Sequence, residues 1–276
     1  MIKAKVQGFP AIDGGGVHLI RVLSNNTYKD FNPFLMLDSF DTDNYDDYKE
    51  GFPMHPHRGI ETLTYISKGK VSHEDSMGNK KTVADGGIQW MTTGSGIMHS
   101  EKFDDVPRLL GLQLWLNMPA KEKMDEPKYL EIKPENAEDF VGDGFKLKVM
   151  AGTYKDKKGA DAPHNPLDYY VVKIDSGKEI TIDSKKGYTN IIFTLIGDVE
   201  VDGEKVNEKT AASLSGEKFV IKALNEDVEL VWFASPPLDE PMEWYGPIVM
   251  NTREELYKAF QELRNGTFIK EKLKED

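Results

Sequence analysis

Short apolar runs alternate with turn residues along most of the chain. The runs are rich in β-branched and aromatic residues, and turn signals such as Gly78-Asn79 and Asp202-Gly203 separate them. Because such runs are typical of strands and such turns of hairpins, the pattern predicts an all-β fold built as a sandwich or barrel. Representative runs are "TLTYISKGKV", "LLGLQLWLNM", "DYYVVKIDSG" and "DVELVWFASPP".

One segment near the C-terminus has a helical period instead. Thr252 and Glu255 form a capping-box pattern. Apolar residues then recur every three or four positions up to Leu263, and Gly266 supplies a stop signal. We therefore expect one short helix at about 253–264.

The strand pattern is interrupted between residues 120 and 140, which are charged, contain proline and are poor in strand character. We interpret this stretch as the connection between two domains, residues 1–130 and residues 131–276. A weak internal repeat supports the division, because "LTYISKGKVSHED" aligns with "IIFTLIGDVEVDG" when Gly69 is set on Gly197. The alternative is chance, since two unrelated β-hairpins can align equally well.

Four candidate metal ligands occur in two closely spaced pairs. His55 and His57 lie in "FPMHPHRGIE", and His99 and Glu101 lie in "GSGIMHSE". Residues i and i+2 of a strand point to the same face, so each pair can converge on one ion. Pro56, between the first two, has no N–H for a ladder hydrogen bond, which favours an edge strand or a barrel rim.

The residue types indicate which metal such a site would hold. Three imidazoles and one carboxylate suit a divalent first-row metal, and a chain without cysteine has no thiolate for a structural zinc site. Iron(II) prefers roughly six ligands, so four from protein would leave two positions for substrate, water or dioxygen. The other histidines, His18, His73 and His164, have no partner at ligand spacing and are expected to be structural.

Composition limits the other classes of function. The net charge of −12 argues against a broad nucleic-acid interface, which needs clustered Lys and Arg. No run of about 18 apolar residues occurs, so no membrane span is expected. The first residues lack a signal-peptide pattern, and the absence of cysteine fits a reducing compartment. We therefore expect a cytoplasmic protein.

Two segments resemble the metal-binding motifs of cupins. The stretch from His55 to Gly69 is similar to the first motif, and the stretch from Gly94 to His99 is similar to the second, with Gly94 in place of the usual proline. More narrowly, the chain resembles the pirin family from about residue 15 to 268. The segments that carry this resemblance are "NPFLMLDSF", "HPHRGIETLTYISKGKVSHEDSMGN", "QWMTTGSGIMHSE", "GLQLWLNMP" and "YGPIVMNTREEL".

The resemblance implies a bicupin, with two cupin-type antiparallel β-barrels or sandwiches of which only the N-terminal one binds iron. The repeat agrees, because His55 and His57 fall at Asp183 and Lys185 in the second copy. Residues 1–130 are thus expected to form the metal-binding cupin. Residues 131–276 are expected to form a cupin without ligands that carries the C-terminal helix.

The resemblance also bears on the carboxylate ligand. In most cupins it is the glutamate of the first motif, here Glu61, whereas in pirins it follows the histidine of the second motif, here Glu101. We expect Glu101 to be the ligand. Glu61 is the second choice, or an acceptor for the N–H of a ligand histidine.

The family resemblance implies a quercetin 2,3-dioxygenase-like activity, in which iron(II) and dioxygen open the ring of a flavonol. Other divalent first-row metals are alternatives to iron. Glu101 would take the proton of the substrate hydroxyl. Trp90 and Met91 would wall an apolar pocket, with ordinary core packing as the alternative.

Two further functions stay open. One is a non-catalytic, redox-sensing iron protein that acts as a transcriptional co-regulator through a protein partner. The other is a cupin whose metal only braces the barrel.

Overall fold

The computed structural model describes residues 1–271, and in it the chain forms two compact units that each combine separate segments. We call the unit that contains the candidate ligands the histidine unit, and the other the second unit. The histidine unit comprises Pro10–Leu19, Met36–Glu131 and residues 238–271, and the second unit comprises Met1–Phe9, Ile20–Leu35 and Ile132–Pro237. The expected division into residues 1–130 and residues 131–276 stays a proposal.

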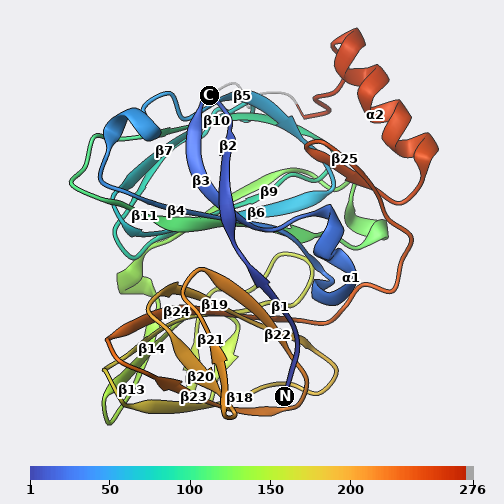
Figure 1. Ribbon diagram of the computed structural model, residues 1–276. Coiled ribbons are helices and arrows are strands. Elements are labelled where there is room, and N and C mark those ends of the chain that lie inside the picture. The colour runs from blue at the N-terminus through green and yellow to red at the C-terminus, as the bar shows by residue number, and fades with distance from the viewer. Residues whose placement is uncertain (272–276) are drawn as a thin grey trace. The chain divides into compact units, whose positions relative to one another are not determined.

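The histidine unit is built around a seven-stranded and a four-stranded antiparallel sheet (Figure 1). The seven-stranded sheet has the order β12 (Lys128–Ile132), β9 (Ile88–Thr92), β6 (Ile60–Lys68), β11 (Leu109–Asn117), β4 (Phe34–Thr42), β3 (Val17–Leu23), β2 (Phe9–Asp13). The four-stranded sheet has the order β5 (Phe52–His57), β10 (Ile97–Phe103), β7 (Lys70–Asp75), β8 (Lys80–Ala84). A separate pair is β25 (Glu243–Tyr245) with β26 (Ile248–Met250).

The second unit has the same architecture. Its seven-stranded sheet has the order β1 (Ile2–Gln7), β22 (Thr210–Leu214), β19 (Thr189–Ile196), β24 (Val228–Ser235), β17 (Asp168–Ile174), β14 (Phe145–Ala151), β13 (Glu138–Gly142). Its four-stranded sheet has the order β18 (Glu179–Asp183), β23 (Lys218–Ala223), β20 (Val199–Val201), β21 (Glu204–Val206). A small pair is formed by β15 (Thr153–Tyr154) and β16 (Lys157–Lys158).

The internal repeat is structural. The order β5-β10-β7-β8 in one unit matches β18-β23-β20-β21 in the other, and β9-β6-β11-β4 matches β22-β19-β24-β17. Gly69 follows β6, Gly197 follows β19, and both have positive φ. The sequence register that sets these two glycines on each other therefore corresponds to equivalent hairpins.

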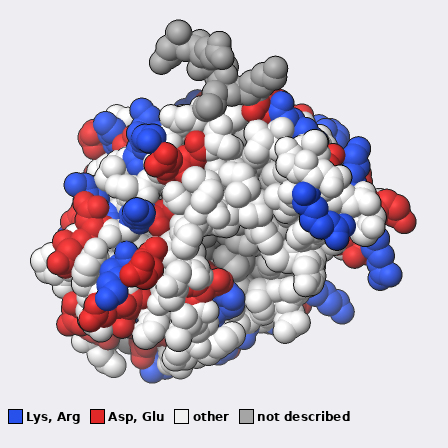
Figure 2. All heavy atoms as spheres, turned by 90° about the horizontal axis from the view of Figure 1, so that it is seen from above, with Lys and Arg blue, Asp and Glu red and all other residues white. Residues whose placement is uncertain are grey.

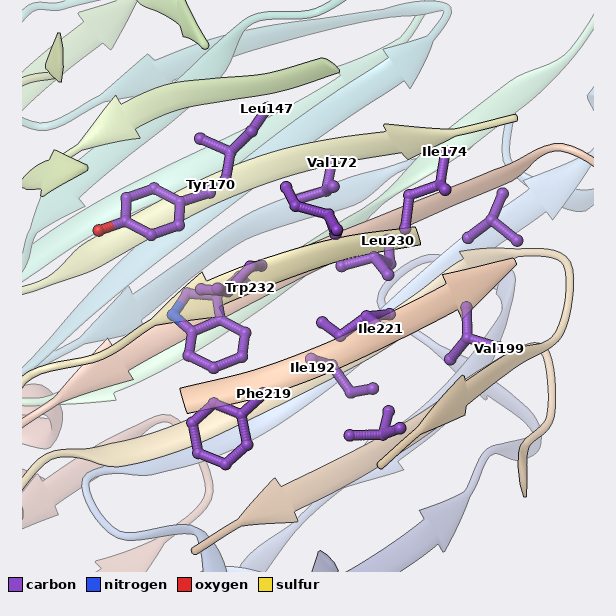
Figure 3. Packing of buried hydrophobic residues seen from close by; sticks show 14 of the residues in the cluster. Leu147, Tyr170, Val172, Ile174, Ile192, Val199, Phe219, Ile221, Leu230 and Trp232 are labelled. Atoms are coloured by element: carbon purple, nitrogen blue, oxygen red, sulfur yellow. The ribbon is translucent and has the colours of Figure 1, made fainter. Parts of the chain in front are cut away.

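Alternating side chains build the core of the second unit. Along β23 the burial alternates strictly, and the buried Phe219 and Ile221 belong to the same apolar cluster as Trp232 of β24. Figure 3 shows these side chains pointing into one layer together with Val172 and Leu230. Alternate residues of the strand therefore point into the core, as the period-2 pattern of the sequence predicts.

The C-terminal helix is confirmed as α2 (Arg253–Asn265). The Thr252 hydroxyl accepts from the Glu255 N–H and the Glu255 side chain accepts from the Thr252 N–H, as the capping box requires. Gly266 ends the helix with φ 69°. The only other α-helix among residues 1–271 is the short α1 (Tyr28–Phe31). Single 3₁₀ turns occupy Asn25–Thr27, Tyr45–Asp47, Ala120–Glu122 and Pro134–Asn136.

The interruption expected at residues 120–140 is only partial. It contains β12 and β13, each at the edge of its seven-stranded sheet. Their charged residues concealed the strand pattern, because an edge strand tolerates polar side chains that a central strand does not. No helix within the described part of the chain has the length and apolar character needed to cross a membrane.

Candidate metal centre

His55, His57 and His99 meet in the histidine unit. One ring nitrogen from each lies within 4.8 Å of the others. Strands β5 and β10 pair so that His99 stands opposite His55, while His57 follows two residues later on β5. The edge position expected from Pro56 is confirmed, because β5 is the first strand of its four-stranded sheet. Two strands thus supply the cluster: β5 gives His55 and His57 at period-2 spacing, and β10 gives His99.

Backbone carbonyls orient the two histidines of β5. His55 Nδ1 lies 2.8 Å from the carbonyl oxygen of Pro53, and His57 Nδ1 lies 3.1 Å from that of Pro247. A carbonyl oxygen can only accept, so each Nδ1 carries the hydrogen and each Nε2 carries a lone pair. The two Nε2 atoms lie 3.0 Å apart. Two lone pairs that face each other at this distance fit a shared cation.

The third histidine completes the set of donors. His99 is 1% exposed, and its Nε2 is buried with no hydrogen-bond partner among the described residues. Burial, together with the neighbouring His55, lowers the pKa of His57 to about 3. Burial and the other histidines also lower the pKa of His99. The imidazoles of His57 and His99 are therefore neutral near pH 7, which is the form that binds a metal. The residues present fit a divalent metal.

Glu101 is held by neutral donors. Its Oε1 accepts from Gln89 Nε2 at 2.8 Å and from the Thr64 hydroxyl at 3.2 Å, and its Oε2 accepts from Gln113 Nε2 at 2.8 Å. The carboxylate is 1% exposed and shares the buried face of β10 with His99. Its oxygens are not part of the 4.8 Å group formed by the histidines. The ligand role of Glu101 stays a prediction.

Glu61 points to the other face of the seven-stranded sheet. Thr64 stands opposite both Gln89 and Gln113, so these three share the face that meets Glu101. Glu61 lies three residues before Thr64 on β6 and therefore on the opposite face. There it accepts from Trp90 Nε1 at 3.2 Å and from the Thr92 hydroxyl at 3.0 Å.

Trp90 and Met91, proposed as pocket walls, are adjacent on β9 and face opposite ways. Met91 shares the face of Gln89, whereas Trp90 lies on the face of Glu61. Two aromatic residues contact the cluster: Trp115 lies edge-on to His57 with ring centroids 4.9 Å apart, and Phe52 lies 6.4 Å from His55. Trp244 lies beyond Trp115 at 6.1 Å. The sequence analysis missed Trp115 because it lies in a continuous apolar run.

Two other features also escaped the sequence analysis. Gln89 and Gln113 are polar residues inside fully buried strands, which is itself a signal that a buried polar partner lies nearby. His73, expected to be an isolated structural histidine, is buried and lies beside His99. Its own signal was Asp75, two residues along the same strand face.

Glycines with positive φ shape the backbone around the site. Gly94 stands where the second cupin motif has proline, and it has φ 45°. Proline is fixed near −65° and cannot adopt that value. A Cβ at Gly94 would also overlap the carbonyl oxygen of Asp125. This departure from the motif therefore follows from a different local backbone.

Replacing Gly59 by alanine is expected to destabilise the protein far more than Gly177→Ala. Both glycines have positive φ, but a Cβ at Gly59 would overlap the carbonyl oxygen of Val249, whereas one at Gly177 would meet nothing within 4 Å. Left-handed backbone costs an L-residue about 1–2 kcal/mol, and overpacking adds about 1–3 kcal/mol. Urea denaturation of both variants measures the difference. Equal losses would contradict the close approach of Val249.

Two family models and several relatives match this chain. The family model described as "Pirin" matches residues 16–116, and the model described as "Pirin C-terminal cupin domain" matches residues 169–269. A protein of Pseudomonas aeruginosa named "Putative quercetin 2,3-dioxygenase" is 39% identical over 269 residues, which are 94% of either chain. The chain belongs to the pirin family. The bicupin fold expected from the sequence is confirmed for this pirin-family chain.

Solved structures of similar fold match most of this chain. A quercetin 2,3-dioxygenase from Acinetobacter baumannii matches with a TM-score of 0.90 and 33% identity over 97% of each chain. A bacterial pirin from Escherichia coli, solved in complex with nickel(II), matches with a TM-score of 0.69 and 24% identity over 86% of this chain and 100% of that one. At that identity the second likeness supports the fold alone.

Proposed function

We propose that this pirin-family protein is a metal-dependent dioxygenase that opens the ring of a flavonol such as quercetin. The metal would be iron(II) in the first place, with other divalent first-row metals as alternatives, held by His55, His57, His99 and Glu101. The observation that carries the proposal is the convergence of three imidazoles, two of them with Nε2 atoms 3.0 Å apart. Relatives named as quercetin dioxygenases support the substrate class.

The side chains around the site would have separate roles in the reaction. A bound divalent metal supplies Lewis acidity toward a substrate hydroxyl and a route for electrons to dioxygen. Glu101 would accept the hydroxyl proton as a base. Trp115 and Met91 would line the apolar side, and Trp90 and Glu61 would support the sheet from its other face.

Access to the site favours a small substrate approaching past His55. Of the four proposed ligands, His55 is partly exposed, whereas His57, His99 and Glu101 are each 1% exposed. The partners we propose are therefore a flavonol-like aromatic molecule and dioxygen. On the face seen in Figure 2, basic side chains lie among acidic and uncharged ones, which does not suit direct nucleic-acid binding. We propose the cytoplasm as the location, since a chain without cysteine needs no oxidising compartment.

The iron(II)-loaded protein is expected to consume oxygen only when a flavonol is added. Chelation of the metal should stop the reaction, and the flavonol absorbance should fall in step with oxygen uptake. An oxygen electrode combined with absorbance spectroscopy measures both. The alternative, a redox-sensing co-regulator, predicts no turnover and a partner affinity that differs between iron(II) and iron(III). Fully loaded protein that consumes no oxygen with several flavonols would favour that alternative.

A further inference from the structure

The three clustered histidines are oriented by different kinds of group. His55 and His57 are fixed by backbone carbonyls, which have no N–H to offer. His99 has no such partner, because its Nδ1 lies 3.4 Å from Nδ1 of another histidine, His73. An imidazole nitrogen can donate or accept according to its tautomer. The hydrogen on His99 therefore depends on where His73 carries its own.

Asp75 decides the tautomer of His73. His73 Nε2 lies 2.8 Å from Asp75 Oδ2, and both side chains are fully buried. The other oxygen of Asp75 accepts from the backbone N–H groups of Met77 and Asn79, at 2.9 and 3.1 Å, which pins the carboxylate in the turn between β7 and β8. The carboxylate only accepts, so His73 Nε2 carries the hydrogen and His73 Nδ1 has the lone pair.

The hydrogen bonds from His99 to His73 and from His73 to Asp75 are then donated in the same direction. His73 Nδ1 accepts from His99 Nδ1–H, which leaves His99 Nε2 with a lone pair. This is the same nitrogen that is buried without a partner. Tyr129 packs on the His73 ring with centroids 4.8 Å apart and holds it in place. Strands β10 and β7 set the spacing, since His99 stands opposite Asp75.

We propose that His73 and Asp75 are positioning residues that prepare His99 Nε2 to bind the metal by fixing its tautomer. Neither residue touches the metal, and Asp75 acts through His73. This inference rests on the proposed metal centre. Its own readout is the tautomer of His99 in metal-free protein, which is measured without any activity.

The decisive variant is Asp75→Asn. The asparagine oxygen can still accept from the turn N–H groups, while its NH₂ takes the place of Oδ2 and donates to His73 Nε2. The Asn79 side-chain amide, which donates to Oδ2 at 2.9 Å in the wild type, must then turn its oxygen toward the new NH₂. His73 must then carry its hydrogen on Nδ1, where it faces His99 Nδ1–H. His99 is expected to change to the Nε2–H tautomer, although the substituted residue does not contact it. Nickel(II) affinity is expected to fall by about 10- to 100-fold.

A second variant tests the acceptor itself. In His73→Asn the side-chain oxygen replaces Nδ1 as acceptor, so His99 is expected to keep its Nδ1–H tautomer and most of its affinity. His73→Leu removes the acceptor and is expected to weaken nickel(II) binding like Asp75→Asn. The matched control is Asp47→Asn, because Asp47 lies 3.2 Å from His18 Nδ1 in another His–Asp pair, outside the cluster. Asp47→Asn should change neither the tautomer of His99 nor the nickel(II) affinity.

The measurements are ¹⁵N NMR of histidine-labelled, chelator-treated protein and competition of nickel(II) binding against a chelator. Wild-type His99 in the Nε2–H tautomer would overturn the proposal at once, whether or not the variants fold. An unchanged His99 tautomer in Asp75→Asn, or equal losses of affinity in His73→Asn and His73→Leu, would also overturn it. Failure of the metal centre itself would appear differently, as wild-type protein that binds no nickel(II) while its tautomers are as expected.

Discussion

Replacing His57 or His99 by alanine is expected to abolish stoichiometric binding of a divalent metal. Each change removes one of three clustered nitrogen donors and leaves a cavity between strands that pair directly. Two imidazoles and a carboxylate already held by Gln89 and Gln113 would be a weak site. Metal analysis after loading and desalting should fall from about one ion per chain to background.

The control for this experiment is His18→Asn, because the His18 side chain is 56% exposed and lies apart from the cluster. It should retain full metal content. His73→Ala, which the sequence alone would suggest as a control, is unsuitable because His73 contacts His99. Equal loss of metal in His18→Asn would mean that the site has been assigned to the wrong residues.

Glu101→Gln is expected to lower the turnover of a flavonol by about 100-fold or more, the scale of losing a general base. The change also affects the surroundings, because a glutamine at 101 would turn an NH₂ group toward the NH₂ groups of Gln89 or Gln113. Oxygen uptake measures the rate, and thermal unfolding measures the structural cost. A large fall in rate with a modest fall in melting temperature supports the role as base or ligand.

Glu61→Gln is the matched comparison. Glu61 is equally buried and accepts two hydrogen bonds, but on the other face of the sheet. It should lose a similar amount of stability with little change in turnover. The reverse ranking, with Glu61→Gln the more damaging to turnover, would favour the ligand set of ordinary cupins.

Local spacing predicted the two parts of the three-histidine cluster. His55 and His57 share a strand face, whereas their meeting with His99 requires β10 to pair with β5, which the family resemblance implied and local spacing did not. The helix could also be predicted, since its capping box, Thr252 and Glu255, lies within four consecutive residues. Features set within one strand or one helical turn can be read from the chain directly.

Features set by pairing across the sheet could not be read in this way. The face on which Glu61 points depends on the register of β6 against β9 and β11, which no local pattern specifies. The donors to Glu101 come from three different strands. Likewise, the contact between His73 and His99 requires β7 and β10 to be neighbours. Long-range pairing, rather than residue type, decides these roles.

The carbonyl of Pro247 that orients His57 lies 190 residues further along the chain. Arg58, the next residue, donates to the carbonyl of Phe268, 210 residues away. During synthesis the histidines leave the ribosome long before these partners exist. At about 5–20 residues per second, the delay between His57 and Pro247 is roughly 10–40 s. A nascent chain therefore carries its histidines without their final orientation until residues 247 and 268 have been made, which ties maturation of the proposed metal centre to synthesis of these distant segments.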